Sequence, residues 1–206
     1  MLFDILVVVS LLVTLLLLRR LVNVYPSLIA CLWRAKECFN LESSVKLARD
    51  RDIITLAMVI PFCLVAFRFR LYDPGFFQGL SDNSVMGLYF VVFLAYVLMR
   101  YAVMLLFTPR RLPQKTTNVA NKASNTFFSV LTLLLLAMGG ILDLLNVDGT
   151  VLRNAMLWVS GAIYAVFLIR KTQIFASSCS IFASFLYLCG LEMIPTGILV
   201  VSAVIF

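Results

Sequence analysis

The stretch IFASSCSIFASFLYLCGLEMIPTGILVVSAVIF, Ile174 to Phe206, contains one charged side chain, Glu192, in 33 residues. An α-helix rises about 1.5 Å per residue, so one straight helix would be about 50 Å long, against a membrane hydrocarbon core of about 30 Å. Two spans joined by a turn would need at least about 40 residues. The length and the apolar composition together predict a membrane helix that is interrupted inside this stretch.

Pro195 is the residue expected to interrupt that helix. A proline ring removes one helical hydrogen bond and crowds the preceding turn. Gly190 and Gly197 stand on either side of it, and a break or strong kink is predicted between these two glycines. Residues 173–192 then form one span with Glu192 at its outer end, and residues 195–206 form a re-entrant segment or a short seventh helix.

The composition of the whole chain indicates a membrane protein. Of its 206 residues, 63% are hydrophobic and 13% are charged, whereas about a quarter of the residues of a soluble domain are charged. We expect a single all-α membrane domain over residues 1–206, with six transmembrane helices and the short C-terminal hydrophobic element. The spans are expected at residues 2–18, 53–70, 85–107, 127–147, 151–169 and 173–192.

The positions of lysine and arginine predict how the chain is threaded. If the N-terminus lies outside, most of the 17 Lys and Arg residues fall on one side of the membrane. Connections that face the cytoplasm retain positive charge during insertion. The pattern therefore predicts a multi-pass protein with its N-terminus outside and its basic connections in the cytoplasm.

Residues 21–50 are expected to form a cytoplasmic segment at the membrane interface. Apolar residues recur at helical spacing from Leu21 to Trp33, and Arg34, Lys36 and Lys46 are among the basic residues that follow. Such a helix would lie on the leaflet with Trp33 at headgroup depth and its cations beside anionic lipids. The alternative is a partly helical connection that packs under the bundle.

The sequence also argues against several classes of function. Histidine is absent, which removes imidazole bases and the commonest zinc ligand. The five cysteines form no Cys-x-x-Cys pair and are interpreted as packing residues, and no catalytic or phosphate-binding motif is found. We expect no enzymatic activity, no cofactor and no metal site. Nucleic-acid binding is not expected either, because it needs a basic face on a soluble domain or tail.

Six ionisable residues are expected to share the outer boundary of the membrane. They are Asp4, Arg68, Arg70, Asp143, Arg153 and Glu192. One interpretation is a set of surface ion pairs and side chains that extend from the helix ends to water. The other is a polar pocket, in which Arg68 or Arg70 binds an anion and Asp143 or Glu192 titrates.

Arg100 is expected about seven residues before the cytoplasmic end of its span. Its side chain either extends to the interface or faces the bundle. In the second case, hairpin geometry brings it to the depth of Asp52 on the neighbouring helix, and an Arg100–Asp52 ion pair is predicted.

Small residues predict close packing of the fourth and fifth spans. Gly139 and Gly140 lie in one, and Gly161 and Ala165 lie in the other. Small side chains let two helix backbones approach each other within a membrane. A tight hairpin of these two helices is therefore expected.

The stretch FLYLCGLEMIPTG, Phe185 to Gly197, resembles a signature, LYLC-x-LE-x-x-P, near the C-terminus of an uncharacterised family of polytopic inner-membrane proteins of Bacteroides-type bacteria. The chain length and the number of spans agree with this family. The resemblance implies a bacterial cytoplasmic membrane. The family has no established activity, so no functional residue is carried over from it.

Two functions are compatible with these observations. The first is a non-enzymatic accessory or scaffold component that contacts anionic lipids at the cytoplasmic face and a membrane-protein partner or a second copy of itself. The alternative is a small transporter or lipid-handling protein that uses the outer polar cluster.

Overall fold

The computed structural model describes residues 2–77, 79–106, 114–145, 147–177 and 181–205. Over these ranges the regular secondary structure is helical throughout, and the all-α expectation is confirmed. The elements are α1 (Leu2–Trp33), α2 (Ala35–Ser43), α3 (Val45–Ala57), α4 (Val59–Arg68), a 3₁₀ turn (Gly75–Phe77), α5 (Asp82–Leu106), α6 (Gln114–Leu144), α7 (Gly149–Ala176), α8 (Ile181–Leu188), a π-turn (Cys189–Met193) and α9 (Ile194–Ile205).

Five helical stretches of the described chain are long and apolar enough to cross a membrane. They are Phe3–Trp33, Asp82–Leu105, Thr116–Leu144, Gly149–Ala176 and Ser184–Ala203. The shortest has 20 residues, or about 30 Å of helix, which matches the thickness of the hydrocarbon core. By length and composition the chain is a polytopic membrane protein.

The first span is longer than the expected range of residues 2–18. Helix α1 continues through Arg19, Arg20 and Pro26 to Trp33. One face of its C-terminal third is buried, because Val24 and Leu28 are fully covered by neighbouring helices. Residues 21–33 therefore belong to this helix, and only α2 and the start of α3 correspond to the expected interfacial segment.

The span expected at residues 53–70 is divided between two short helices. Helix α3 ends at Ala57 and the ten-residue helix α4 begins at Val59. Pro61 explains the division. In a continuous helix its ring would collide with the carbonyl of Ala57, four residues earlier, whereas a proline in the first turn of a new helix is tolerated.

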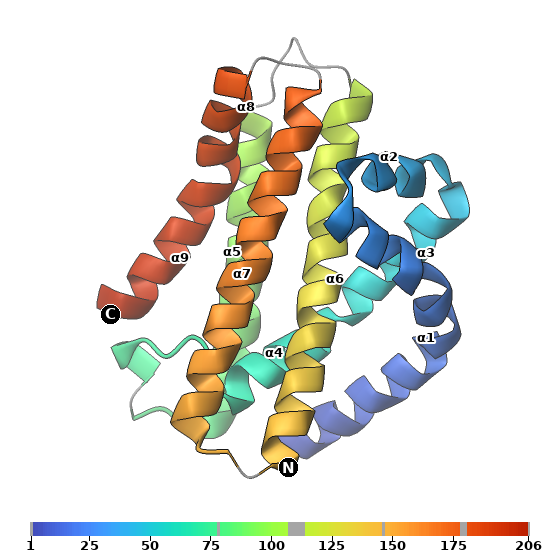
Figure 1. Ribbon diagram of the computed structural model, residues 1–206. Coiled ribbons are helices and arrows are strands. Elements are labelled where there is room, and N and C mark those ends of the chain that lie inside the picture. The colour runs from blue at the N-terminus through green and yellow to red at the C-terminus, as the bar shows by residue number, and fades with distance from the viewer. Residues whose placement is uncertain (1, 78, 107–113, 146, 178–180, 206) are drawn as a thin grey trace.

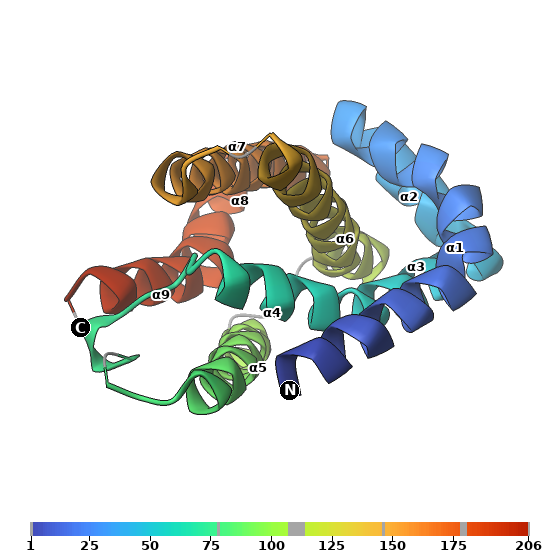
Figure 2. The same ribbon diagram turned by 90° about the horizontal axis from the view of Figure 1, so that it is seen from below.

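The helices form one bundle around α6 and α7, which pack against each other. Helices α5, α6 and α7 run between the two ends of the molecule, with α1 to α3 on one side and α8 to α9 on the other (Figure 1). Seen along the bundle, α4 crosses the middle between α5 and α6 (Figure 2), and it packs against both. Helix α5 ends, α6 begins and α7 ends at the same end of the bundle.

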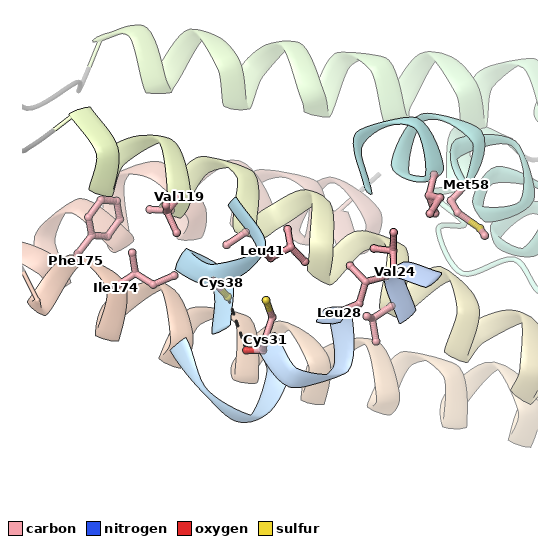
Figure 3. Packing of buried hydrophobic residues seen from close by; sticks show 13 residues of the cluster. Val24, Leu28, Cys31, Cys38, Leu41, Met58, Val119, Ile174 and Phe175 are labelled. Atoms are coloured by element: carbon pink, nitrogen blue, oxygen red, sulfur yellow. Dashed lines mark hydrogen bonds between the residues drawn. The ribbon is translucent and has the colours of Figure 1, made fainter. Parts of the chain in front are cut away.

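The largest buried apolar cluster attaches α1, α2 and α3 to α6 and α7 (Figure 3). Its members are Val24, Leu28, Cys31, Cys38, Leu41, Ile54, Met58, Val119, Ala120, Ala123, Val130, Ile174 and Phe175. One face of α2 is thus part of the core, while Lys36 and Asn40 on its other face are exposed. Of the five cysteines, Cys179 lies outside the described residues. Cys31, Cys38 and Cys63 are buried and Cys189 is half-buried.

Gly139 is the glycine at which α6 and its neighbours come closest. A Cβ atom there would lie 3.1 Å from Met156 Cε and 3.1 Å from Phe69 Cε2. The structure places no atom within 4 Å of a Cβ built on Gly140 or Gly161. The close packing of α6 and α7 therefore depends on one of the predicted glycines, because the others face away from the contact.

A break or strong kink was expected between Gly190 and Gly197, and the chain stays helical there through the π-turn. The π-turn stands directly before Pro195, and Ile194 N–H donates to the carbonyl of Cys189, five residues back. A π-turn closes its hydrogen bond five residues back and so inserts one extra residue into the helix. This extra residue lies shortly before a proline that has no N–H to donate. The helix axis changes direction across this turn (Figure 1).

The structure places Glu192 at a different depth from the predicted one. Residues 173–176 complete α7, so the last span begins after the connection that follows α7 and runs from Ser184 to Ala203. Glu192 then lies near the middle of the last span. The expected position was the outer end of a span over residues 173–192.

Candidate functional site

One carboxylate and two cations from three elements meet in the interior of the bundle. Glu192 belongs to the π-turn, Arg100 to α5 and Lys171 to α7. Arg100 Nη2 donates to Glu192 Oε1 at 2.6 Å, and Lys171 Nζ donates to the same oxygen. The exposed fraction of the side chain is 2% for Glu192, 1% for Lys171 and 25% for Arg100. Two of the three charges are therefore buried, and Arg100 connects them to the surface.

Hydroxyl groups hold the last span in the register that places Glu192 at this point. Tyr164 Oη of α7 donates to the backbone carbonyl of Glu192 at 3.0 Å. One turn further on, Tyr96 Oη and Thr196 Oγ1 are 3.2 Å apart. Hydrogen bonds between membrane helices are worth about 0.6 to 2 kcal/mol each, so these contacts orient the π-turn towards α5 and α7.

Two aromatic rings lie close to the two cations. Phe167 of α7 lies with its ring centroid 5.9 Å from Arg100 Cζ and 5.5 Å from Lys171 Nζ. The centroid of the Phe175 ring is 5.9 Å from Lys171 Nζ. The face of an aromatic ring attracts a cation, and this attraction strengthens when water is excluded. The rings therefore add a favourable contact to both cations inside the bundle.

A cleft of about 160 Å³ opens beside the three charges. It is lined by Val97, Arg100, Tyr101, Met104, Asn121, Ser124, Lys171, Leu191 and Glu192. These residues carry two positive charges and one negative charge, so the cleft has an excess of one positive charge. It is smaller than the roughly 300 to 1,000 Å³ of a pocket for a drug-sized ligand, and its size suits a small ion or a headgroup.

A second charge network connects α2, α3 and α6. Arg51, whose side chain is 2% exposed, donates from Nη1 to Glu42 at 2.9 Å and from Nη2 to Asp52 at 2.9 Å. Lys122 lies 3.0 Å from Glu42 and 3.6 Å from Asp52, and Asn125 donates to Asp52 at 3.2 Å. Burial raises the pKa of Asp52, but Arg51, Asn125 and Lys122 lower that pKa by more, so it lies below its ordinary value. The charges of two acidic and two basic side chains cancel here, which is typical of a structural network.

The predicted pair of Arg100 with Asp52 is not formed, and each residue has another partner. Arg100 bonds to Glu192, and Asp52 bonds to Arg51. Helix α3 packs against α1 and α6, whereas α5 packs against α4, α9 and the π-turn. Equal depth in the membrane was the basis of the prediction, and it does not make two helices neighbours.

The structure separates Glu192 from the other residues of the predicted outer cluster. Those five belong to helix ends that gather at the opposite end of the bundle from the end of α7 (Figure 1). Asp4, Arg68, Arg70 and Asp143 are exposed, and Arg70 Nη1 lies 4.0 Å from Asp73. Arg153 is half-buried, and its Nε is a buried nitrogen with no hydrogen-bond partner in the described part of the chain.

Lys171 is the site residue that was not predicted from the sequence. The sequence alone places it among the many basic residues of the predicted cytoplasmic side. The signal that could have found it is Glu192 itself, because a carboxylate inside an apolar run requires a counter-charge. Lys171 is the nearest basic residue before it in the sequence.

Residues 4–202 match the family described as a domain of unknown function (DUF4271), and the chain belongs to this family. The resemblance to an uncharacterised domain family is confirmed at this level. No curated protein and no solved structure matches the chain.

Proposed function

We propose that the protein is a non-catalytic membrane protein that binds a small anionic group in the cleft between α5, α6, α7 and the π-turn. This is the class of a small transporter or lipid-handling protein, with the site at Arg100, Lys171 and Glu192 in place of the outer cluster. The observation that supports it is the excess positive charge of a cleft whose charged residues are largely buried.

Glu192 and Lys171 are charges buried inside the bundle. Ionisable residues inside a membrane are expensive, and they commonly mark pathways or binding sites for substrates and ions. One ion pair would satisfy Glu192, yet two cations bond to the same oxygen atom. The cations therefore outnumber the carboxylate, and the net positive charge attracts an anion to the cleft.

Arg100 is the residue best placed to meet such a ligand. Its side chain is 25% exposed and lines the cleft. A guanidinium group has five N–H donors in a planar fork that matches carboxylate and phosphate groups. Within the described residues, Glu192 is the only side chain to which Arg100 donates a hydrogen bond, so donors remain for a bound anion.

The lining of the cleft favours binding over chemical conversion. Ser124 and Tyr101 supply its hydroxyl groups, and the described lining residues include no base paired with either of them. A nucleophilic hydroxyl needs an adjacent base for activation. A ligand in this cleft would therefore be held or moved without being converted.

The orientation that we propose has the N-terminus outside a bacterial cytoplasmic membrane, so that the cleft faces the cytoplasmic half. Basic residues at the predicted cytoplasmic side, such as Arg34 and Lys36 after α1 and Arg170 near the end of α7, support this orientation. Helices α1 and α5 begin at the same end of the bundle (Figure 1), which favours a sixth crossing made by α3 and α4 together. The cleft then lies within reach of cytoplasmic ions and of headgroups of the inner leaflet.

An accessory role at the cytoplasmic face is the second candidate function. The observation that favours it is the surface where α1 passes into α2, with Trp33 75% exposed and Arg34 and Lys36 also exposed. A tryptophan among cations suits the headgroup layer of a leaflet that contains anionic lipids. A membrane-protein partner or a second copy of the chain would then pack against the lipid-facing helices.

Native mass spectrometry of the protein from a gentle detergent tests the anion site even though its ligand is unidentified. The wild type is expected to retain an anionic adduct of defined mass, which Arg100→Gln and Lys171→Gln lose. Arg19→Gln is the matched control, because it removes an exposed cation outside the cleft. Absence of an adduct, or equal retention by all variants, would reject the anion site. A mass above that of one chain would support the accessory role.

A further inference from the structure

We infer that Glu192 is a proton-operated counterion, so that an anion occupies the cleft together with a proton on the Glu192 carboxyl group. This inference rests on the proposed anion site and adds its regulation and the charge of its ligand. It assigns a monovalent anion as the ligand, with a phosphodiester group, free or in a lipid, as the chemistry that suits Arg100 and Lys171.

Glu192 and an incoming anion compete for the same two cations. Arg100 and Lys171 both donate to Oε1 of Glu192. While Glu192 is ionised, it engages both cations and repels a second anion at close range. An incoming anion must therefore displace the carboxylate from the cations or find it neutral.

A proton on Glu192 removes this obstacle. The carboxyl group then bears no charge, and two cations are left close together in a region of low dielectric constant without a counter-charge. A monovalent anion that enters the cleft replaces the lost negative charge. The three side chains with an ionised Glu192 carry a net charge of +1, and the protonated form with one bound monovalent anion also carries +1. Since the total charge does not change, the exchange avoids burying additional charge.

The surrounding groups leave Glu192 as the carboxyl group that can respond in this way. Helix α5 presents Arg100 to it, and α7 presents Lys171 and the hydroxyl of Tyr164. Helix α6 lines the cleft with uncharged side chains, while its Lys122 is paired with Glu42 and Asp52 in the second network. Among the described residues that line the cleft, Glu192 is the only acid.

The consequence is a reciprocal link between proton binding and anion binding. If a proton favours the anion by a given factor, the anion favours the proton by the same factor. In the limit of tight linkage, the affinity for a monovalent anion rises about tenfold for each unit by which the pH falls. A protein that changes access to this cleft from one side of the membrane to the other would carry the proton and the anion together.

Isothermal titration calorimetry with two probes tests the inference on the full chain. Dimethyl phosphate serves as a free phosphodiester, and phosphatidylglycerol in lipid nanodiscs presents the same group in a lipid. Neither probe changes its own protonation between pH 6 and 8. For the wild type we expect affinity to rise about tenfold per unit of falling pH, with about one proton taken up per anion at pH 8. Binding of only one probe identifies the source of the group.

The variant Glu192→Gln carries an uncharged side chain of similar shape and provides the second test. It should bind at pH 8 at least as tightly as the wild type binds at pH 6, with no proton uptake and no dependence on pH. If the variant does not fold, proton uptake by the wild type still decides the question, measured in two buffers that differ in ionisation enthalpy. Wild-type binding that is independent of pH and takes up no proton would overturn the inference and leave the anion site intact. Failure of both proteins to bind either probe at any pH would remove the anion site as well.

Discussion

Lys171 and Glu192 stand 21 residues apart in the sequence and form a hydrogen-bonded ion pair in which each side chain is almost fully buried. The pair joins α7 to the last span, and Arg100 of α5 adds a second cation to the same carboxylate oxygen. Three membrane-crossing segments are thus held together by charges whose removal has consequences that can be measured.

Glu192→Ala should destabilise the protein by about 3 to 5 kcal/mol, because it leaves the Lys171 ammonium buried without a counter-charge. The double variant with Lys171→Met should lose less than the single variant, since the uncompensated charge is gone. Unfolding by SDS in mixed micelles, followed by circular dichroism, measures both. Asp143→Ala removes an exposed carboxylate and should change stability by no more than about 0.5 kcal/mol. Additive losses in the double variant would contradict the importance of the pair.

Arg51→Met should cost about 1.5 to 3 kcal/mol of stability, because Glu42 and Asp52 lose charge-assisted hydrogen bonds to a buried guanidinium group while keeping Lys122 as a partner. The expected loss is largest in the part of the molecule formed by α2 and α3, so hydrogen exchange should accelerate there first. Arg49→Met is the matched control on the exposed face of α3. Equal effects of the two substitutions would show that the network contributes no more than a surface charge.

Adjacent glycines in α6 should respond in opposite ways to alanine. Gly139→Ala places a methyl group 3.1 Å from Met156 Cε and Phe69 Cε2, and overpacking of this kind costs about 1 to 3 kcal/mol. Gly140→Ala meets no atom within 4 Å and should gain up to about 1 kcal/mol from higher helix propensity. Thermal unfolding of the two variants under the same conditions compares them directly. A stabilising Gly139→Ala would mean that α6 and α7 can separate without cost.

Pro195→Ala should preserve the fold but raise the affinity for the anion at pH 8 by at least about tenfold, equivalent to 1.4 kcal/mol, because the competing carboxylate leaves the two cations. Alanine restores a backbone N–H, which lets the π-turn relax towards an ordinary α-helix. The extra residue of the π-turn then moves, and Glu192 rotates away from Arg100 and Lys171. Calorimetric titration with dimethyl phosphate at pH 8 measures the gain, and circular dichroism checks the helix content. Unchanged affinity would show that the π-turn does not position the carboxylate.

Membrane-impermeant maleimide should label intact cells at Ser81→Cys and leave Ser43→Cys unlabelled, each in a background without native cysteines. Both positions are exposed, one between α4 and α5 and the other at the end of α2. This difference in labelling is expected because basic connections stay in the cytoplasm during insertion. Permeabilised cells should label at both positions, which controls for reactivity. Labelling of Ser43→Cys alone in intact cells would reverse the proposed orientation.

Much of the architecture follows from local properties of the sequence. Apolar runs of span length are sufficient to identify the membrane helices, and the ranges predicted at residues 85–107, 127–147 and 151–169 overlap α5, α6 and α7. The predicted boundaries of the helices were less accurate where a charged residue or a proline was interpreted as the end of a helix. Helix α1 passes through Arg19, Arg20 and Pro26, since neighbouring helices cover its far part and the two arginines remain exposed.

By itself, the sequence determined that the chain is an all-α membrane protein with one isolated carboxylate in its last apolar run, because hydropathy is a property of each segment alone. The partners of that carboxylate were decided only by the tertiary structure. Arg100 and Lys171 lie 92 and 21 residues away, and the rotation of each helix about its axis selects which side chains meet. That rotation depends on how the helices pack and on the single extra residue of the π-turn, neither of which is encoded in the apolar pattern of a single segment.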